Sequence, residues 1–261
     1  MINDKKILCV ITARKGSKGI TGKNYNDLFG KPLFMWSVLA AMNSKYVDRV
    51  VVSSNCDNVY SHLDKFAKRE LDLCRCNRVT PSSKMPFFIK RPEEISGDLS
   101  KNEEALIHSI QYLKDKDNEE FDIVINLQPT SPCRLDFLLD RCIIKYNEGS
   151  YDSLLTAIKI TPFLWQKING KWEYNVDKNG CCNRKMRQEF LEDDENSEFL
   201  MHDNGNIFIS NVKMLLETKC RVGSNPCVFE TDKLNSLQID EEFDFELIEN
   251  MAKVRNLKSL I

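Results

Sequence analysis

The chain has 261 residues, of which 42% are hydrophobic and 29% charged, as in an ordinary globular protein that buries a large core. Its 37 lysines and arginines nearly balance its 39 aspartates and glutamates, which argues against a general nucleic-acid binder. No stretch approaches the roughly 18 consecutive apolar residues of a membrane span, and the first residues lack a signal-peptide pattern. We therefore expect a cytoplasmic protein with neither nucleic acid nor membrane as a partner.

The ten cysteines are irregularly spaced along the chain. Neither close set, Cys74 with Cys76 or Cys181 with Cys182, has the two-residue gap that is typical of zinc and redox sites. None of the three histidines is placed to complete a metal site. The sequence predicts free thiols, most of them buried.

The first part of the chain alternates strand-like and helix-like segments. Residues 5–11 and 48–55 are short runs rich in Ile and Val, which is typical of buried strands. Residues 31–44, with Pro32 in the first turn, and residues 58–71 have helical patterns. This order predicts an α/β fold in which right-handed crossovers join parallel strands.

The rest of the chain continues this fold and adds an insertion. After an irregular stretch at 72–90 we expect a helix at 101–115, for which Ser100 is a candidate N-cap. Strands follow at 121–128 and 151–160, with a helix at 135–149 between them. The chain then continues with a hairpin at 165–176 around Asn169-Gly170, a polar flap at 177–204, a strand at 206–212 and a helix at 239–256. The sequence thus predicts a single domain over residues 1–261, with the hairpin and flap inserted at about 161–205.

The loop TARKGSKGITGKN, residues 12–24, separates the first strand from the first helix. Ligands of open α/β sheets bind at the carboxyl ends of strands, and glycines let backbone N–H groups approach an anion. The loop is not a P-loop, because Ser17 stands where a glycine is needed and Asn24 where Ser or Thr is needed. Its three glycines, spaced by three, also fail the dinucleotide fingerprint. These residues favour a phosphate-binding loop, but a solvated connector remains an alternative.

Residues 13–24, ARKGSKGITGKN, resemble the nucleotide-binding loop of the acylneuraminate cytidylyltransferases, the CMP-sialic acid synthetases and their bacterial relatives. Other segments resemble the family in the same order: KRPEEISGD at 90–98, NLQPTSPCR at 126–134, RQEF at 187–190, DNGNIFIS at 203–210 and QIDEEFDFELIE at 238–249. The resemblance spans about residues 5–250. The related Kdo cytidylyltransferases carry a different first loop and fit less well.

The resemblance implies a fold and a reaction. The expected fold is α/β, a mostly parallel Rossmann-like nucleotidyltransferase sheet with an inserted β-hairpin that serves as a dimerisation arm in a homodimer. The expected reaction transfers CMP from CTP to the anomeric hydroxyl of a nine-carbon 2-keto sugar acid and releases pyrophosphate, with Mg²⁺ as cofactor. Sialic, legionaminic and pseudaminic acids all remain candidate acceptors. Another sugar nucleotidyltransferase, of the Kdo or sugar-phosphate type, and an inactive nucleotide-binding homologue are the alternatives.

The resemblance also implies roles for individual residues. The nucleotide would be bound by Arg14, Lys18, Lys23, Asn24, Arg91, Ser100 and Asn102; the sugar by Gln128 and Arg187; the metal by Asp240; and Lys23 and Arg187 would act in catalysis. Each position also has a structural interpretation, such as a helix N-cap for Ser100 or a strand-end cap for Gln128.

The chain departs from the family pattern at several positions. Asn102 replaces a common serine, Cys133 replaces a leucine, and Gln238 stands where the family often has the first aspartate of a D-x-D pair. The last change puts a two-aspartate metal site in doubt, and Asp244 is a candidate to assist. In the flap, Arg184 is an alternative to Arg187.

Overall fold

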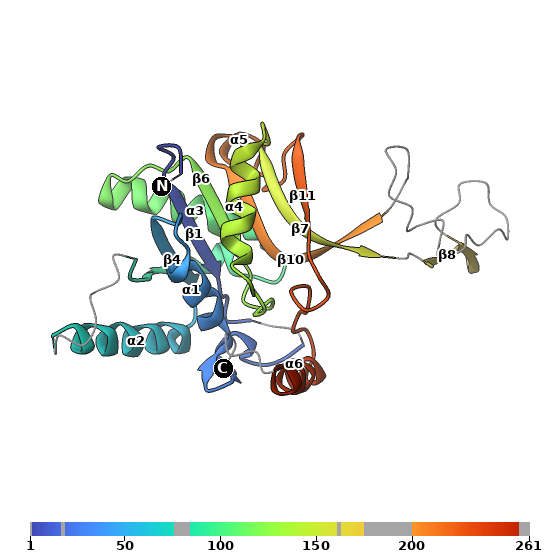
Figure 1. Ribbon diagram of the computed structural model, residues 1–261, viewed down its shortest axis with the longest axis horizontal. Coiled ribbons are helices and arrows are strands. Elements are labelled where there is room, and N and C mark those ends of the chain that lie inside the picture. The colour runs from blue at the N-terminus through green and yellow to red at the C-terminus, as the bar shows by residue number, and fades with distance from the viewer. Residues whose placement is uncertain (1, 17–18, 76–83, 161–162, 175–199, 256–261) are drawn as a thin grey trace.

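The computed structural model describes residues 2–16, 19–75, 84–160, 163–174 and 200–255. Its centre is a seven-stranded sheet in the order β11-β7-β10-β6-β1-β4-β5 (Figure 1). Neighbouring strands are parallel except around β10, which runs antiparallel to both β6 and β7. The strands are β1 (Ile7–Thr12), β4 (Arg49–Ser54), β5 (Phe87–Lys90), β6 (Ile123–Leu127), β7 (Ser153–Ile160), β10 (Leu200–Asn211) and β11 (Pro226–Glu230).

Helices cover both faces of this sheet, which explains why the central strands are continuous apolar runs rather than alternating ones. Side chains of α1, α2 and α4 share one buried cluster with the sheet, and those of α3 and α5 share a second cluster with the strands. The helices are α1 (Leu33–Asn43), α2 (Asp57–Arg75), α3 (Asn102–Asp117), α4 (Leu138–Glu148), α5 (Val212–Thr218) and α6 (Glu242–Arg255). The predicted α/β class with a mostly parallel sheet is confirmed.

A third apolar cluster lies outside the two sheet faces and joins both ends of the described chain. It brings Ile20 of the first loop and Trp36 of α1 against Ile239, Ile248 and Ala252 of the α6 region. The short strands β2 (Asp27–Leu28) and β3 (Lys31–Pro32) pair beside it. This packing holds the start of α6 next to the glycine-containing loop.

Several element boundaries differ from the predictions. The stretch 72–90 was expected to be irregular, but α2 continues to Arg75 and β5 forms at the sheet edge, where Phe87 and Phe88 are half-buried. The strand expected at 206–212 begins earlier, at Leu200, because its first residues pair with β7. Both β11 and α5 lie in a region for which no element was predicted.

Ser100 is not the N-cap of α3, which was its structural alternative. The N-cap is Lys101, whose backbone N–H donates to the Glu104 carboxylate at 2.9 Å. The Glu104 carboxylate therefore satisfies the backbone donor of the N-cap residue, as the glutamate of a capping box does.

The predicted hairpin is present as β8 (Trp165–Ile168) and β9 (Lys171–Tyr174). Its two turn residues, Asn169 and Gly170, have φ angles of 49° and 83°, as the right-handed twist of a two-residue hairpin requires. Figure 1 shows it away from the helices that cover the sheet. Most of the flap expected at 177–204 lies outside the described residues.

The six cysteines with described side chains are free, and five of them are buried. Burial raises the pKa of the Cys9 and Cys133 thiols to about 12, so both stay protonated at neutral pH. The prediction of free, mostly buried thiols is confirmed for these six, and the other four side chains lie outside the described part. No helix in the described ranges is long and apolar enough to cross a bilayer.

Candidate active site

The strand order creates a crevice beside β1. The chain leaves β1 toward β4 and β5 on one side, whereas β6 pairs with β1 on the other side. Such a reversal of strand order separates the connections at the carboxyl ends of the strands, where ligands of open α/β sheets bind. Thr12 ends β1, and Gln128 directly follows β6 at this edge.

A cavity of about 480 Å³ opens at this crevice. It collects residues from the first loop, the segment after β5, the start of α3, the turn after β6 and the segment before α6. The lining residues are Thr12, Arg14, Gly16, Gly19, Lys23, Asn24, Arg91, Ser100, Asn102, Gln128, Pro129, Thr130 and Asp240. Eight of the ten predicted site residues are thus brought to one cavity, and the other two, Lys18 and Arg187, lie outside the described residues.

The first loop is held in shape by its own side chains. Asn24 donates its amide N–H to the Arg14 carbonyl at 2.8 Å, which closes the loop across ten residues. The Arg14 guanidinium donates to the Gly97 carbonyl at 2.6 Å and lies 3.2 Å from the Asp98 carboxylate. Asn24 therefore fixes the loop in addition to lining the cavity, and Arg14 reaches the cavity wall from a fixed position.

Arg91 is a buried cation at the cavity wall, with 4% of its surface exposed. Its guanidinium donates to the Ser53 hydroxyl at 3.1 Å and to the Ser53 carbonyl at 2.8 Å, both neutral acceptors. Within the described part of the chain, no carboxylate pairs with it. Burial, with a further contribution from Arg14, lowers its pKa to about 10, so the group remains charged at neutral pH. A buried, charged guanidinium without a counter-ion favours an anionic ligand in this cavity.

Lys23 connects the first loop to the segment before α6. Its side chain is buried, and Nζ donates to the Ile239 carbonyl at 2.8 Å and to the Asp240 carboxylate at 3.1 Å. Asp240 itself is largely exposed, with 68% of its side chain accessible. Two of the three ammonium protons therefore hold the segment, and the Asp240 carboxylate remains open toward the cavity.

The acidic groups near α6 test whether a magnesium ion fits. Mg²⁺ is usually held by one or two carboxylates together with substrate phosphates and water. Asp240 is the one carboxylate among the described lining residues. Asp244, the candidate second ligand, accepts the backbone N–H groups of Asp240 and Glu241 at 2.7 and 2.8 Å, and so fixes the start of α6. The described residues form no cluster of three metal-ligating side chains, and Asp240 is the candidate metal ligand among the described lining residues.

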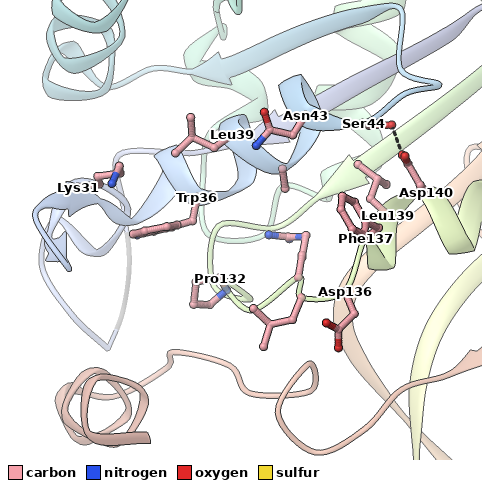
Figure 2. Close-up of a pocket in the computed structure, with 13 residues that line it drawn as sticks. Lys31, Trp36, Leu39, Asn43, Ser44, Pro132, Asp136, Phe137, Leu139 and Asp140 are labelled. Atoms are coloured by element: carbon pink, nitrogen blue, oxygen red, sulfur yellow. Dashed lines mark hydrogen bonds between the residues drawn. The ribbon is translucent and has the colours of Figure 1, made fainter. Parts of the chain in front are cut away.

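A second cavity, of about 450 Å³, lies between α1 and the turn after β6 (Figure 2). Trp36 and Leu39 project from α1, and Pro132 and Asp136 come from the turn. Arg134 also lines this cavity, but its terminal nitrogens donate to Ser37, Asn206 and the Gln128 carbonyl, the last at 2.8 Å. Arg134 was not predicted as a site residue. Its hydrogen bond to the Gln128 carbonyl fixes the backbone at Gln128 from the side of the second cavity. The charged cavity beside β1 remains the candidate active site.

Comparison with known proteins shows similarity to cytidylyltransferases in sequence and in fold. Residues 8–82 match the family model described as cytidylyltransferase. The fold is shared with a solved CMP:2-keto-3-deoxy-manno-octonic acid synthetase complexed with CTP, at a TM-score of 0.59 and 15% identity over 96% of this chain and 99% of that one. The chain therefore shares its α/β fold with that synthetase, and its first part is similar in sequence to cytidylyltransferases.

Two curated relatives match the chain over nearly its whole length. The chain is 26% identical, over 98% of its length, to N-acylneuraminate cytidylyltransferase of Escherichia coli O18:K1:H7 and spans 54% of that protein. It is 25% identical to CMP-N,N'-diacetyllegionaminic acid synthase of Campylobacter jejuni, over 97% of both chains. The chain thus spans about half the length of the first relative and nearly all of the second. The resemblance predicted from the sequence is confirmed: the chain is similar to acylneuraminate cytidylyltransferases and to a legionaminic acid synthase over nearly its whole length.

The packing of the first loop on the α6 segment is testable at two glycines. A Cβ on Gly19 would lie 2.5 Å from the backbone carbonyl oxygen of Asp240, whereas one on Gly16 would meet nothing within 4 Å. We expect Gly19→Ala to separate the loop from the segment, to lower the free energy of unfolding by about 1–3 kcal/mol and to weaken nucleotide binding at least tenfold. Chemical denaturation and calorimetric titration with CTP measure both effects. For stability, Gly16→Ala is the matched control, and an equal loss of the free energy of unfolding in both variants would contradict the packing argument.

Proposed function

We propose that the protein transfers CMP from CTP to the anomeric hydroxyl of a sialic-acid-like, nine-carbon 2-keto sugar acid and releases pyrophosphate. The observation that carries the proposal is the cavity at the carboxyl ends of β1, β5 and β6, where Arg14, Lys23 and Arg91 converge without enough acidic groups to neutralise them. The names of the relatives, an N-acylneuraminate cytidylyltransferase and a legionaminic acid synthase, supply the nucleotide and the acceptor class.

The cations suit a transfer that needs positioning and charge neutralisation rather than a covalent intermediate. In the proposed reaction, the acceptor oxygen bonds to the α-phosphorus while the bond to the β-phosphate oxygen breaks and the hydroxyl proton is released. Arg14 and Arg91 hold phosphate oxygens, and Lys23 stabilises the charge that develops on the leaving pyrophosphate. By resemblance alone, Lys18 joins the nucleotide site and Arg187 contacts the acceptor. Asn24, Ser100 and Asn102 complete the nucleotide wall.

Asp240 has two successive partners in this proposal. Without nucleotide, its carboxylate is 3.1 Å from the Lys23 ammonium. A bound triphosphate competes with Asp240 for the Lys23 ammonium. When the ammonium moves to the phosphates, the exposed Asp240 carboxylate becomes available to hold Mg²⁺ next to them. The ion, when bound, neutralises charge on the triphosphate. Gln128, at the end of β6, offers amide N–H donors and an amide oxygen that can hydrogen-bond the sugar that receives CMP.

We further propose a homodimer and a cytoplasmic location. The hairpin displays Trp165 and Trp172 with 56% and 65% of their surfaces exposed. A two-stranded hairpin is only marginally stable by itself, and exposed apolar surface of this kind often marks a protein–protein contact. By resemblance, this arm packs on a second copy of the chain. The free thiols support a reducing compartment.

The reaction is tested by release of pyrophosphate from CTP and Mg²⁺ with a panel of acids: N-acetylneuraminate, N,N'-diacetyllegionaminate, pseudaminate and Kdo. We expect release with at least one nine-carbon acid, and little with UTP or dTTP in place of CTP. Arg91→Ala should weaken CTP binding about 10- to 100-fold, because a buried charge-assisted contact is lost. Arg69→Ala, at an exposed position on α2, is the control. No release with any acid would refute the proposed activity.

The role of Asp240 is tested by Asp240→Asn. We expect the magnesium concentration for half-maximal activity to rise at least tenfold, because the amide is a poor ligand for Mg²⁺. CTP binding without magnesium should be unchanged or tighter, because a negative charge near the phosphates is removed and Lys23 is released. Calorimetry with and without Mg²⁺ separates these effects. Glu241→Gln, the neighbouring exposed carboxylate, serves as the control, and an equal shift in both variants would argue against Asp240 as the metal ligand.

The oligomeric state is tested by sedimentation equilibrium. We expect a species of twice the chain mass, and we expect Trp172→Glu to yield a monomer because it places a charge on the exposed apolar face of the hairpin. Thr218→Glu, an exposed position at the end of α5, should leave the dimer intact. A wild-type monomer would overturn the dimer while leaving the proposed reaction standing.

A further inference from the structure

Two glutamine side chains from distant segments meet over Gly205. Gly205 lies in the irregular part of β10 with a φ of +61°. A Cβ at this position would be 2.7 Å from Nε2 of Gln238 and 3.4 Å from Oε1 of Gln128. Gln128 follows β6, and Gln238 precedes α6. The absence of a side chain at Gly205 therefore leaves the space that both amide groups share.

The backbone beneath the two amides is fixed by a buried network. The Gln238 Nε2 donates to the carbonyl of Asn204, a residue with only 1% of its surface exposed. The Asn204 amide group in turn accepts from Thr156 at 2.7 Å and donates to Thr231 at 2.7 Å and Ser236 at 3.0 Å. Every member is a neutral hydrogen-bonding group with a partner, so the network holds the irregular part of β10 in one geometry.

This contact also fixes the orientation of the Gln238 amide. Only a nitrogen can donate to the Asn204 carbonyl, so Oε1 of Gln238 and the second N–H of Nε2 are left for another partner. Within the part of the chain that the structure describes, the Gln128 amide makes no hydrogen bond. Gln128 lines the cavity and Gln238 meets it over Gly205, so the two side chains together offer acceptors and donors beside this part of the cavity wall.

The chemistry of this pair differs from that of the cations that line the cavity. The cations that line it come from the first loop and the segment after β5, and they suit phosphates and carboxylates. The two amides carry no charge, and they match neutral groups that both donate and accept, such as a hydroxyl or an acylamino substituent. A site that hydrogen-bonds a substituent rejects analogues that lack it, because its own polar groups lose their partners.

We propose that Gln238 is a specificity-determining residue that, together with Gln128, binds a neutral acylamino substituent of the acceptor sugar. This inference rests on the proposed function and adds to it a residue and the part of the acceptor that the residue contacts. It assigns Gln238 to acceptor selection, whereas Asp240, two residues later, belongs to the nucleotide end. Gly205 is also part of the proposed substituent-binding site, because any side chain at this position would displace the Gln238 amide.

The test compares acceptors that differ at one substituent. Pyrophosphate release with CTP and Mg²⁺ is measured for N-acetylneuraminate, for N,N'-diacetyllegionaminate and for their analogues with a hydroxyl in place of one acylamino group. For Gln238→Ala we expect kcat/KM for the acylamino acid that the wild type uses to fall about fivefold relative to its hydroxyl analogue, as the loss of a neutral hydrogen bond predicts. The KM for CTP should change less than twofold. Gln111→Ala, which removes the same side chain from an exposed position on α3, should change neither value.

A second variant, at Gly205, displaces the Gln238 amide without changing the Gln238 side chain itself. Gly205→Ala places a methyl group against Nε2 of Gln238, so it should reproduce the loss of acceptor discrimination without weakening CTP binding. If Gln238→Ala lowers kcat/KM equally for both acids, or leaves their ratio unchanged, the inference is wrong although the enzyme activity stands. If the wild-type protein releases pyrophosphate with none of the acids, the proposed function fails, and the inference fails with it.

Discussion

The ammonium group of Lys23 joins the first loop of the protein to its last helix, and the shape of the candidate site depends on this contact. Nζ donates to the Ile239 carbonyl at 2.8 Å while Gly19 lies against the neighbouring carbonyl of Asp240. On the opposite side, the Ile239 N–H donates to the carbonyl of Thr130, in the turn after β6, at 2.8 Å. The segment before α6 is therefore held between the two strand-end loops, and its Ile239 side chain is buried in the third apolar cluster.

Around this contact the cavity is divided by charge. Arg14 and Arg91 lie on the side of β5 and α3, and Arg91 keeps its charge although burial lowers its pKa. Gln128 lies on the side of β10 and meets Gln238, which stands beside the cavity, over Gly205; the supporting groups there are amides, hydroxyls and carbonyls. A ligand that carries a triphosphate at one end and neutral polar substituents at the other matches this division. Antiparallel β10 contributes to it, since its irregular part brings Gly205 to the end of β6.

The sequence predicts the elements whose local pattern matches their environment. β1, β4 and β6 are buried apolar runs, and the turn at Asn169-Gly170 specifies its hairpin by backbone conformation alone. β5 was missed because it has four residues, only one of them buried, after a proline-containing stretch. The cavity-lining residues proposed from the resemblance come together, but the supporting residues do not follow from any local pattern. Arg134 holds the Gln128 carbonyl from behind, and the position of Gln238 depends on a glycine 33 residues earlier, which only the tertiary structure reveals.

The wide sequence separation within the site also affects how the protein is made. Lys23 and Asp240 are 217 residues apart, and the Lys6–Asp122 and Leu135–Asn235 contacts are also long-range. A ribosome adds about 5–20 residues per second, so the first loop waits on the order of ten seconds or longer for its partner segment to be synthesised. During that time the loop's cations lack the backbone that later orders them, and the third apolar cluster is incomplete. The nascent chain thus acquires its charged cavity late, when nearly all of the sheet has already been synthesised.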